Sequence, residues 1–136
     1  MVLGRFAHVV NGDNEMNNNE AHTKLIRETC MLISMYPCIK AFSIYNGGVY
    51  SESRHTYLKT GPFHPKGIAD IMVHSEKVKT LYIECKTGEG VQSSDQKDWQ
   101  GMCEQFKIPY TVIHEKHEAL QFLRKEGVIG KELEGI

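Results

Sequence analysis

The fold of this chain is decided by two short stretches, which read GIADIMV from Gly67 to Val73 and LYIECK from Leu81 to Lys86. Each stretch is rich in apolar and β-branched residues and has the length of a short strand. Together, however, they carry two carboxylates and an ammonium group. Because burying such groups is costly unless they pair or bind a metal, charged residues in strands of this kind indicate a functional site.

The polar segment between the two stretches, residues 74–79, is short, which predicts an antiparallel hairpin. A turn centred on Lys77 places Asp70 opposite Glu84, with their Cβ atoms roughly 5 Å apart on one face. The alternation of side chains along a strand puts Lys86 on that same face. The other face is then apolar and consists of Ile71, Val73, Leu81, Ile83 and Cys85. A shift of one residue in register would separate the two acids.

Two carboxylates at this separation repel each other unless they share a proton or a cation. A small number of hard oxygen ligands suits Mg²⁺ or Mn²⁺, which keep several waters and accept phosphate oxygens as further ligands. The backbone carbonyl of Cys85 is placed to be another ligand, and Lys86 to neutralise a phosphate or position a water. Asp70 and Glu84 therefore predict metal-assisted phosphodiester hydrolysis. The alternative is an exposed hairpin with salt bridges, because Lys and Glu alternate on many solvated strands.

Three motifs follow one another along the chain: PKGIAD from Pro65 to Asp70, YIECKTGEG from Tyr82 to Gly90, and QKDW from Gln96 to Trp99. In this order they strongly resemble the VRR-Nuc family, which lies within the PD-(D/E)xK nuclease superfamily. The resemblance extends from about Glu20 to Phe122. The chain departs from the superfamily pattern at Ala69, where the pattern has proline.

The resemblance implies that Asp70 and Glu84 bind the metal and that Lys86 is the catalytic lysine. Gln96 matches the glutamine that the family carries on the next helix, and Glu20 matches the acid that often completes the metal site. Glu20 and Gln96 each have a structural alternative. An acid in the first turn of a helix favours the helix dipole without touching a metal, and Gln96 follows a serine at the spacing of a capping box.

The family also implies an α/β fold in which a mixed β-sheet is flanked by helices, as in restriction endonucleases. Apolar periodicity predicts helices at residues 20–36, after Ser93 and at residues 118–125. Besides the central hairpin, strands are predicted at residues 39–45, 49–52 and 108–114, the last of them buried. The first two strands are expected to form a hairpin through a turn at residues 46–48.

Residues 53–66 are expected to form a basic loop that contains Arg54, Lys59 and Lys66. Such a loop suits contact with DNA phosphates, although solvated loops often have the same composition. Residues 1–19 are expected to form an extension, either an edge strand or flexible, before a single domain at residues 20–130. Residues 131–136 are expected to form a short tail.

The composition is that of an ordinary globular protein: 136 residues, 40% hydrophobic, 24% charged, with a formal net charge of −1. No apolar run reaches membrane-spanning length, and no signal peptide is recognised. Four cysteines without a C-x-x-C pair indicate reduced thiols and a cytoplasmic protein.

The sequence thus predicts a Mg²⁺- or Mn²⁺-dependent endonuclease for branched DNA such as a Holliday junction, since small standalone members of the family look like junction resolvases. Cutting a four-way junction needs two symmetric nicks, which predicts a two-fold homodimer. The alternatives are a less selective nuclease that cuts flaps, nicked or linear DNA, and a nucleic-acid-binding module without turnover. Whether one or two metal ions act stays open.

Overall fold

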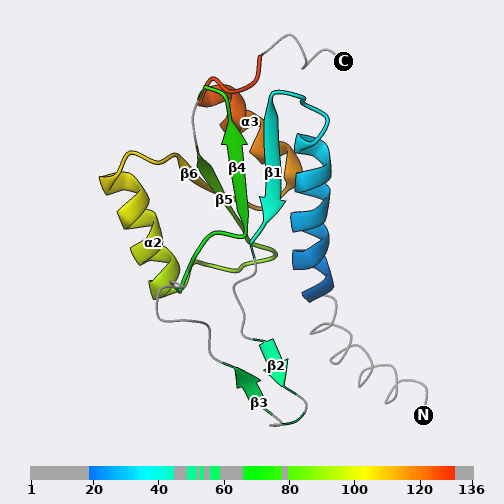
Figure 1. Cartoon of the computed structure of the whole chain (residues 1–136), viewed down its shortest axis with the longest axis vertical. Coiled ribbons are helices and arrows are strands. Elements are labelled where there is room, and N and C mark those ends of the chain that lie inside the picture. Colours follow the sequence, from blue (N-terminus) through cyan, green and yellow to red (C-terminus); the bar gives the residue numbers. More distant parts are fainter. Residues whose placement is uncertain are drawn as a thin grey trace, which may run out of the picture.

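The structure is a computed structural model that describes residues 19–44, 49–51, 53, 56–58, 66–77 and 80–130. A first helix covers residues 19–33. After it come β1 (Ile39–Ser43), β2 (Val49–Ser51), β3 (Thr56–Leu58), β4 (Ile71–Ser75), β5 (Leu81–Cys85), α2 (Ser94–Gln105), β6 (Tyr110–Ile113) and α3 (Lys116–Lys125), as Figure 1 shows. The predicted extension and tail lie outside the described residues, apart from Asn19, which is helical.

The central hairpin has the predicted register. Strands β4 and β5 pair antiparallel, with Ile71 opposite Ile83 and Val73 opposite Leu81. These four side chains are completely buried, as expected for the apolar face of the hairpin. Strand β4 begins directly after Asp70 rather than at Gly67, so this acid lies at the end of the hairpin.

The main sheet is mixed and has the strand order β1-β4-β5-β6. Strands β1, β4 and β5 are antiparallel neighbours, whereas β5 and β6 are parallel. Parallel neighbours need a crossover connection, and α2 supplies it. The prediction of an α/β fold with a mixed sheet between helices is confirmed at this level.

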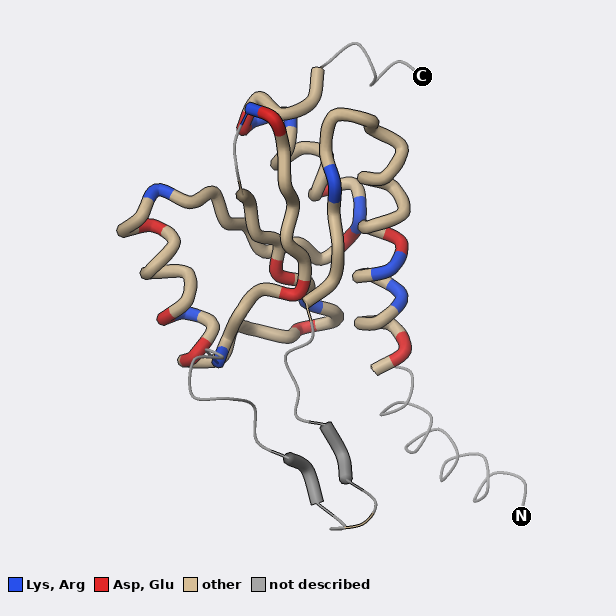
Figure 2. The backbone as a smooth tube through the Cα atoms, viewed as in Figure 1, with Lys and Arg blue, Asp and Glu red and all other residues tan. Residues whose placement is uncertain are grey.

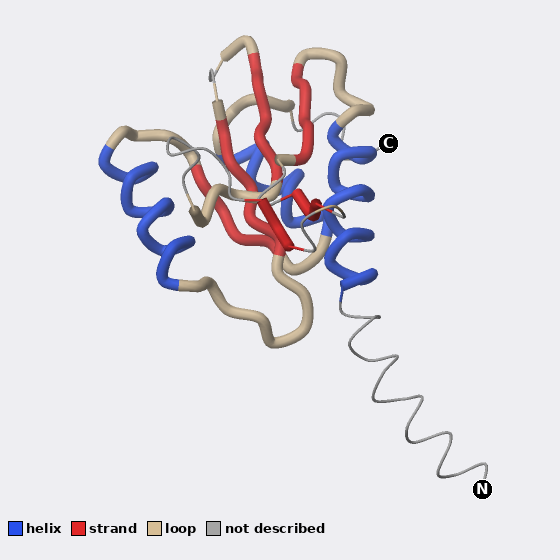
Figure 3. Tube along the Cα trace, turned by 60° about the horizontal axis from the view of Figure 1, so that its bottom comes forward, coloured by secondary structure: helices blue, strands red, loops and turns tan. Residues whose placement is uncertain are grey.

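Helices cover both faces of the main sheet. The buried face of β4 and β5 packs against the first helix and α3, through residues such as Leu25, Ile33 and Leu123. On the opposite face, Trp99 of α2 meets Tyr82 of β5 edge to face, with 5.4 Å between ring centroids. Figure 3 shows the sheet between α2 on one side and the other two helices on the other.

The predicted hairpin between residues 39–45 and 49–52 is wrong. Strand β1 pairs with β4 over its whole length, from Ile39 opposite Ser75 to Ser43 opposite Ile71. Strand β2 instead pairs with β3, and β3 lies within residues 53–66, which are predicted to form a loop. Pairing with β4 lets Ile39 and Ala41 join the core, which a local hairpin would not provide. The expected turn at residues 46–48 lies outside the described residues.

Two predicted elements are shorter or less buried than expected. The first helix ends at residue 33, and residues 34–38 form turns; Ser34 Oγ donates to the carbonyl oxygen of Met31 at 2.6 Å, a local bond that competes with helix continuation. Strand β6 is an edge strand of the sheet. Only Ile113 in it is fully buried, because an edge strand has one neighbour and less cover.

All four cysteines are free thiols, and Cys85 and Cys103 are buried. Within the described part of the chain, no helix has both the length and the apolar character needed to cross a bilayer. Figure 2 shows basic and acidic residues interspersed along the first helix and α2. Neither of these two helices is therefore uniformly basic.

Candidate metal-dependent active site

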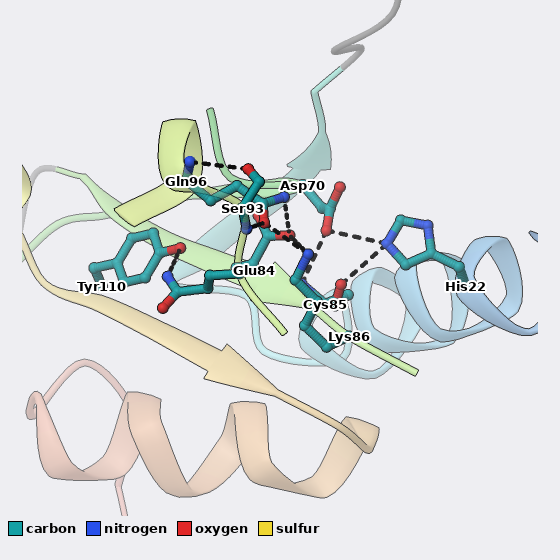
Figure 4. Close-up of polar contacts among 9 residues, drawn as sticks. His22, Asp70, Glu84, Cys85, Lys86, Ser93, Gln96 and Tyr110 are labelled. Atoms are coloured by element: carbon teal, nitrogen blue, oxygen red, sulfur yellow. Dashed lines mark hydrogen bonds and ion pairs between the residues drawn. The ribbon is translucent and has the colours of Figure 1, made fainter. Parts of the chain in front are cut away.

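The predicted acids meet at one end of the main sheet, where β4 begins and β5 ends (Figure 4). In the register that pairs Ile71 with Ile83, Asp70 and Glu84 are the next opposing positions. Both are buried, with 9% and 1% of their surface exposed. The N-terminal turns of the first helix and α2 also reach this end of the sheet, through His22 and Gln96.

Asp70 is held by the backbone of the neighbouring strand. Its Oδ2 accepts a hydrogen bond from the backbone N–H of Cys85 at 2.9 Å. This bond ties the residue before β4 to the last residue of β5. It points the Asp70 carboxylate toward the end of the hairpin. There His22 Nε2 contacts both Asp70 Oδ2 and the carbonyl oxygen of Cys85.

Glu84 is the most buried charged residue of the site. Its Oε2 accepts from Gln96 Nε2 at 2.9 Å and lies 3.5 Å from Lys86 Nζ. Its Oε1 is buried without a hydrogen-bond partner. Burial, and then the negative charge of Asp70, raises the pKa of Glu84 to about 8, against the opposing effect of the Lys86 ammonium.

Gln96 connects the lysine, the glutamate and the start of α2. Its Oε1 accepts from Lys86 Nζ at 2.7 Å and from the Ser93 backbone N–H at 2.8 Å, while its Nε2 donates to Glu84. The backbone N–H of Gln96 in turn donates to Ser93 Oγ at 3.2 Å, which completes a capping box. The Gln96 side chain therefore closes the capping box and also contacts both Glu84 and Lys86.

The first helix brings a different residue to the site from the one predicted. His22 Nε2 lies 3.0 Å from the carbonyl oxygen of Cys85 and 3.3 Å from Asp70 Oδ2. Glu20 is exposed and lines a separate cavity with Thr23 and Arg27. Residues two apart on a helix point in nearly opposite directions, so the helix cannot present both to the sheet.

His22 was not predicted, because the resemblance to the family pointed to Glu20 as the residue of this helix at the site. A signal was present in the apolar periodicity: His22 precedes Leu25 and Thr29 by three and seven residues, and both of these are buried. The inward stripe of the helix therefore runs through position 22 and leaves position 20 outside.

Tyr110 of β6 is a second residue that sequence reasoning did not select. Its hydroxyl oxygen accepts from Gln92 Nε2 at 3.0 Å, beside the loop that leads into α2. Burial raises the pKa of Tyr110 to about 12, and the nearby charges of Glu84 and Asp70 act in the same direction. The phenol therefore borders the acids as a neutral, polar group.

The predicted DNA-contacting residues are only partly described. Lys66 is exposed in a turn that leads to Gly67. Arg54 and Lys59 lie outside the described residues. The structure therefore gives no position for these two side chains relative to the acids.

The donor set fits a hard divalent cation in its chemistry. The two carboxylates and the Cys85 carbonyl are oxygen ligands, and Mg²⁺ or Mn²⁺ needs only one or two carboxylates because it keeps its waters. The unpartnered Oε1 of Glu84 is a buried acceptor that such a cation would satisfy. Among the described residues, no three His, Cys, Asp or Glu side chains lie together so as to hold a metal ion as they stand, so a cation here would draw on the Cys85 carbonyl and on its own waters beside the two carboxylates.

Comparisons of the chain with protein-family models, with curated proteins and with solved structures give no match. The fold and the site define an α/β protein in which two buried acids and a lysine at one end of a four-stranded mixed sheet meet a glutamine from α2. The functional interpretation depends on that arrangement.

Proposed function

We propose that this chain is a metal-dependent DNA endonuclease with a PD-(D/E)xK-type fold, similar to VRR-Nuc proteins. The observation that carries the proposal is the burial of Glu84 beside Asp70, with one carboxylate oxygen left without a partner. Keeping two carboxylates this close is costly for the fold alone, whereas a cation between them offsets the repulsion. Asp70, Glu84 and the Cys85 carbonyl would hold Mg²⁺ or Mn²⁺.

When bound, the ion would supply Lewis-acid stabilisation of the phosphate and a lowered pKa for the attacking water. Lys86 would place its ammonium against the scissile phosphate, because its Nζ is already held beside Glu84 by Gln96. The N-terminus of α2, which begins at the same end of the sheet, adds a partial positive charge that favours phosphate. These residues therefore bind and orient a phosphodiester and position the water that attacks it.

The preferred substrate in this proposal is branched DNA, such as a four-way junction. The alternative enzymatic function is that of a less selective nuclease, which cuts flaps, nicked or linear duplexes. The alternative without catalysis is a nucleic-acid-binding module. The presence of the whole set Asp70, Glu84, Lys86 and Gln96 argues against the binding module.

The experiment is a cleavage assay on labelled junction, flap, nicked and linear duplex DNA with Mg²⁺ or Mn²⁺. Lys86→Ala removes the ammonium and should lower cleavage by roughly 10²–10³-fold, while a gel-shift assay in Ca²⁺ should show DNA binding largely retained. Lys125→Ala, an exposed lysine on α3, is the matched control and should cut normally. Equal cleavage by the Lys86 variant and the wild type would refute the proposed function.

A further inference from the structure

His22 is a polar group that contacts the site and to which the proposed nuclease chemistry gives no role. Its Nε2 lies between two oxygens of the proposed metal site, 3.0 Å from Cys85 O and 3.3 Å from Asp70 Oδ2. The side chain is 38% exposed, so ions in solution can reach it. Figure 4 shows the ring entering the site from the first helix, on the side opposite Gln96.

The position of His22 is set by packing of the helix. Leu25 and Thr29, which share its stripe, are buried against the sheet, and Leu25 belongs to the hydrophobic core. Rotating the helix to withdraw His22 would expose both of them. The ring is therefore held at the site by the same contacts that hold the helix.

A hydrogen-bonded ring in this position is also suited to bind a metal. The Cys85 carbonyl can only accept, so its contact with His22 is a hydrogen bond when the proton is on Nε2. In the other neutral tautomer the proton sits on Nδ1, and the lone pair of Nε2 faces the same two oxygens. Neighbouring ligands of a small six-coordinate ion with bonds near 2.1 Å are about 3 Å apart, so the observed separations suit ligands of one ion.

We propose that His22 Nε2 is a ligand of the ion held by Asp70, Glu84 and the Cys85 carbonyl, and that the site therefore binds Mn²⁺ or Co²⁺ more tightly than Mg²⁺. The inference rests on the proposed function, which assigns an ion to those oxygens. Imidazole nitrogen strengthens binding of transition-metal ions, whereas Mg²⁺ favours oxygen ligands and its own waters. The first helix thus contributes nitrogen where a carboxylate from Glu20 was predicted.

The test is calorimetric titration of the full, chelator-treated chain with MnCl₂, CoCl₂ and MgCl₂ separately. His22→Ala should weaken Mn²⁺ and Co²⁺ binding by roughly tenfold or more and leave Mg²⁺ binding much less affected, so that the preference disappears. The visible absorption of bound Co²⁺ should change in the same variant, because a nitrogen ligand is lost. His117→Ala, an exposed histidine on α3, should match the wild type in every titration.

Asp70→Asn separates this inference from the proposed function. If the wild type binds none of the three ions, both fail. If Asp70→Asn abolishes binding while His22→Ala leaves all affinities and the Co²⁺ spectrum unchanged, the proposed metal site stands and the role of His22 is refuted. Tighter binding of every ion by His22→Ala would also refute it, since the ring would then compete with the ion. His22→Gln, which keeps a polar side chain, replaces the alanine variant if circular dichroism shows misfolding.

Discussion

Glu84 shows at the scale of a single residue how folding and function oppose each other at this site. A leucine in its place would bury apolar surface without the cost of removing a charge from water. The carboxylate instead keeps one oxygen bonded to Gln96 and the other without a partner. Such a residue destabilises the fold unless a proton or a cation compensates its charge.

This gives a pH prediction for the metal-free protein. The pKa of Glu84 lies at about 8 in the folded chain and near its ordinary 4.5 in the unfolded chain. Between these values the folded state binds more protons, so the free energy of unfolding should fall as pH rises through this window. Urea denaturation in a chelator at several pH values measures the slope.

Glu84→Gln is the control for the pH prediction, because an amide of the same shape does not titrate. Its unfolding free energy should depend less steeply on pH than that of the wild type across the same window. Equal slopes for the two proteins would show that Glu84 titrates normally in the folded chain.

Substitutions at the N-terminal end of α2 can separate two effects. One is capping of the helix by Ser93 and Gln96, and the other is the contact of Gln96 with Glu84 and Lys86. Ser93→Ala removes the hydroxyl that accepts from the Gln96 backbone and should cost about 1 kcal/mol of stability. Gln96→Ala also removes the side-chain half of the capping box, and in addition its bonds to Glu84 and Lys86. Cleavage should therefore fall by roughly 10–100-fold in the glutamine variant and change little in the serine variant.

Thermal unfolding and cleavage measured on both variants check this prediction. If the two variants lose cleavage in proportion to their loss of stability, Gln96 acts only as a helix cap. If Gln96→Ala loses far more activity than Ser93→Ala at similar stability, the amide is part of the site.

Gly67, in the turn that precedes β4, packs against the backbone of the first turn of α2. It adopts a φ of +79°, and a Cβ atom there would overlap the backbone carbonyl of Asp95 and lie 2.7 Å from the Gln96 backbone nitrogen. Gly67→Ala should therefore destabilise the protein by about 1–3 kcal/mol, displace Gln96 and lower cleavage. Urea denaturation and the cleavage assay measure both effects.

Gly101 in α2 is the matched control for this substitution. No atom lies within 4 Å of a Cβ built there, and an exposed helical glycine is less stable than alanine by about 0.5–1 kcal/mol. Gly101→Ala should therefore stabilise the protein and leave cleavage unchanged. A Gly67→Ala variant that behaved in the same way would show that the two segments do not need their close contact.

At the scale of the whole molecule, the proposed junction specificity requires two sites with two-fold symmetry. We therefore expect sedimentation at micromolar concentration to give a mass of twice 15.5 kDa. A monomer under these conditions, with and without junction DNA, would exclude the two-nick mechanism. It would leave the less selective nuclease as the surviving proposal.

The local pattern of the hairpin was predictable because it depends on short-range rules. Alternation and turn position are enough to set the register of β4 against β5 and to bury one face. The capping box at Ser93 and Gln96 follows from spacing in the same way. The partner of β1 was not predictable, because pairing with β4 depends on long-range burial that no local turn signal encodes.

The sequence by itself determined the two acids, the lysine and the glutamine as one candidate site, because strand alternation and motif order are properties of the chain. The apolar stripe of the first helix runs through position 22, but only the tertiary structure decided where along the sheet this stripe lies. His22, rather than Glu20, reaches Asp70 and Cys85, because the angle at which a helix meets a sheet depends on the packing of its whole buried stripe. That angle is a property of many distant contacts acting together.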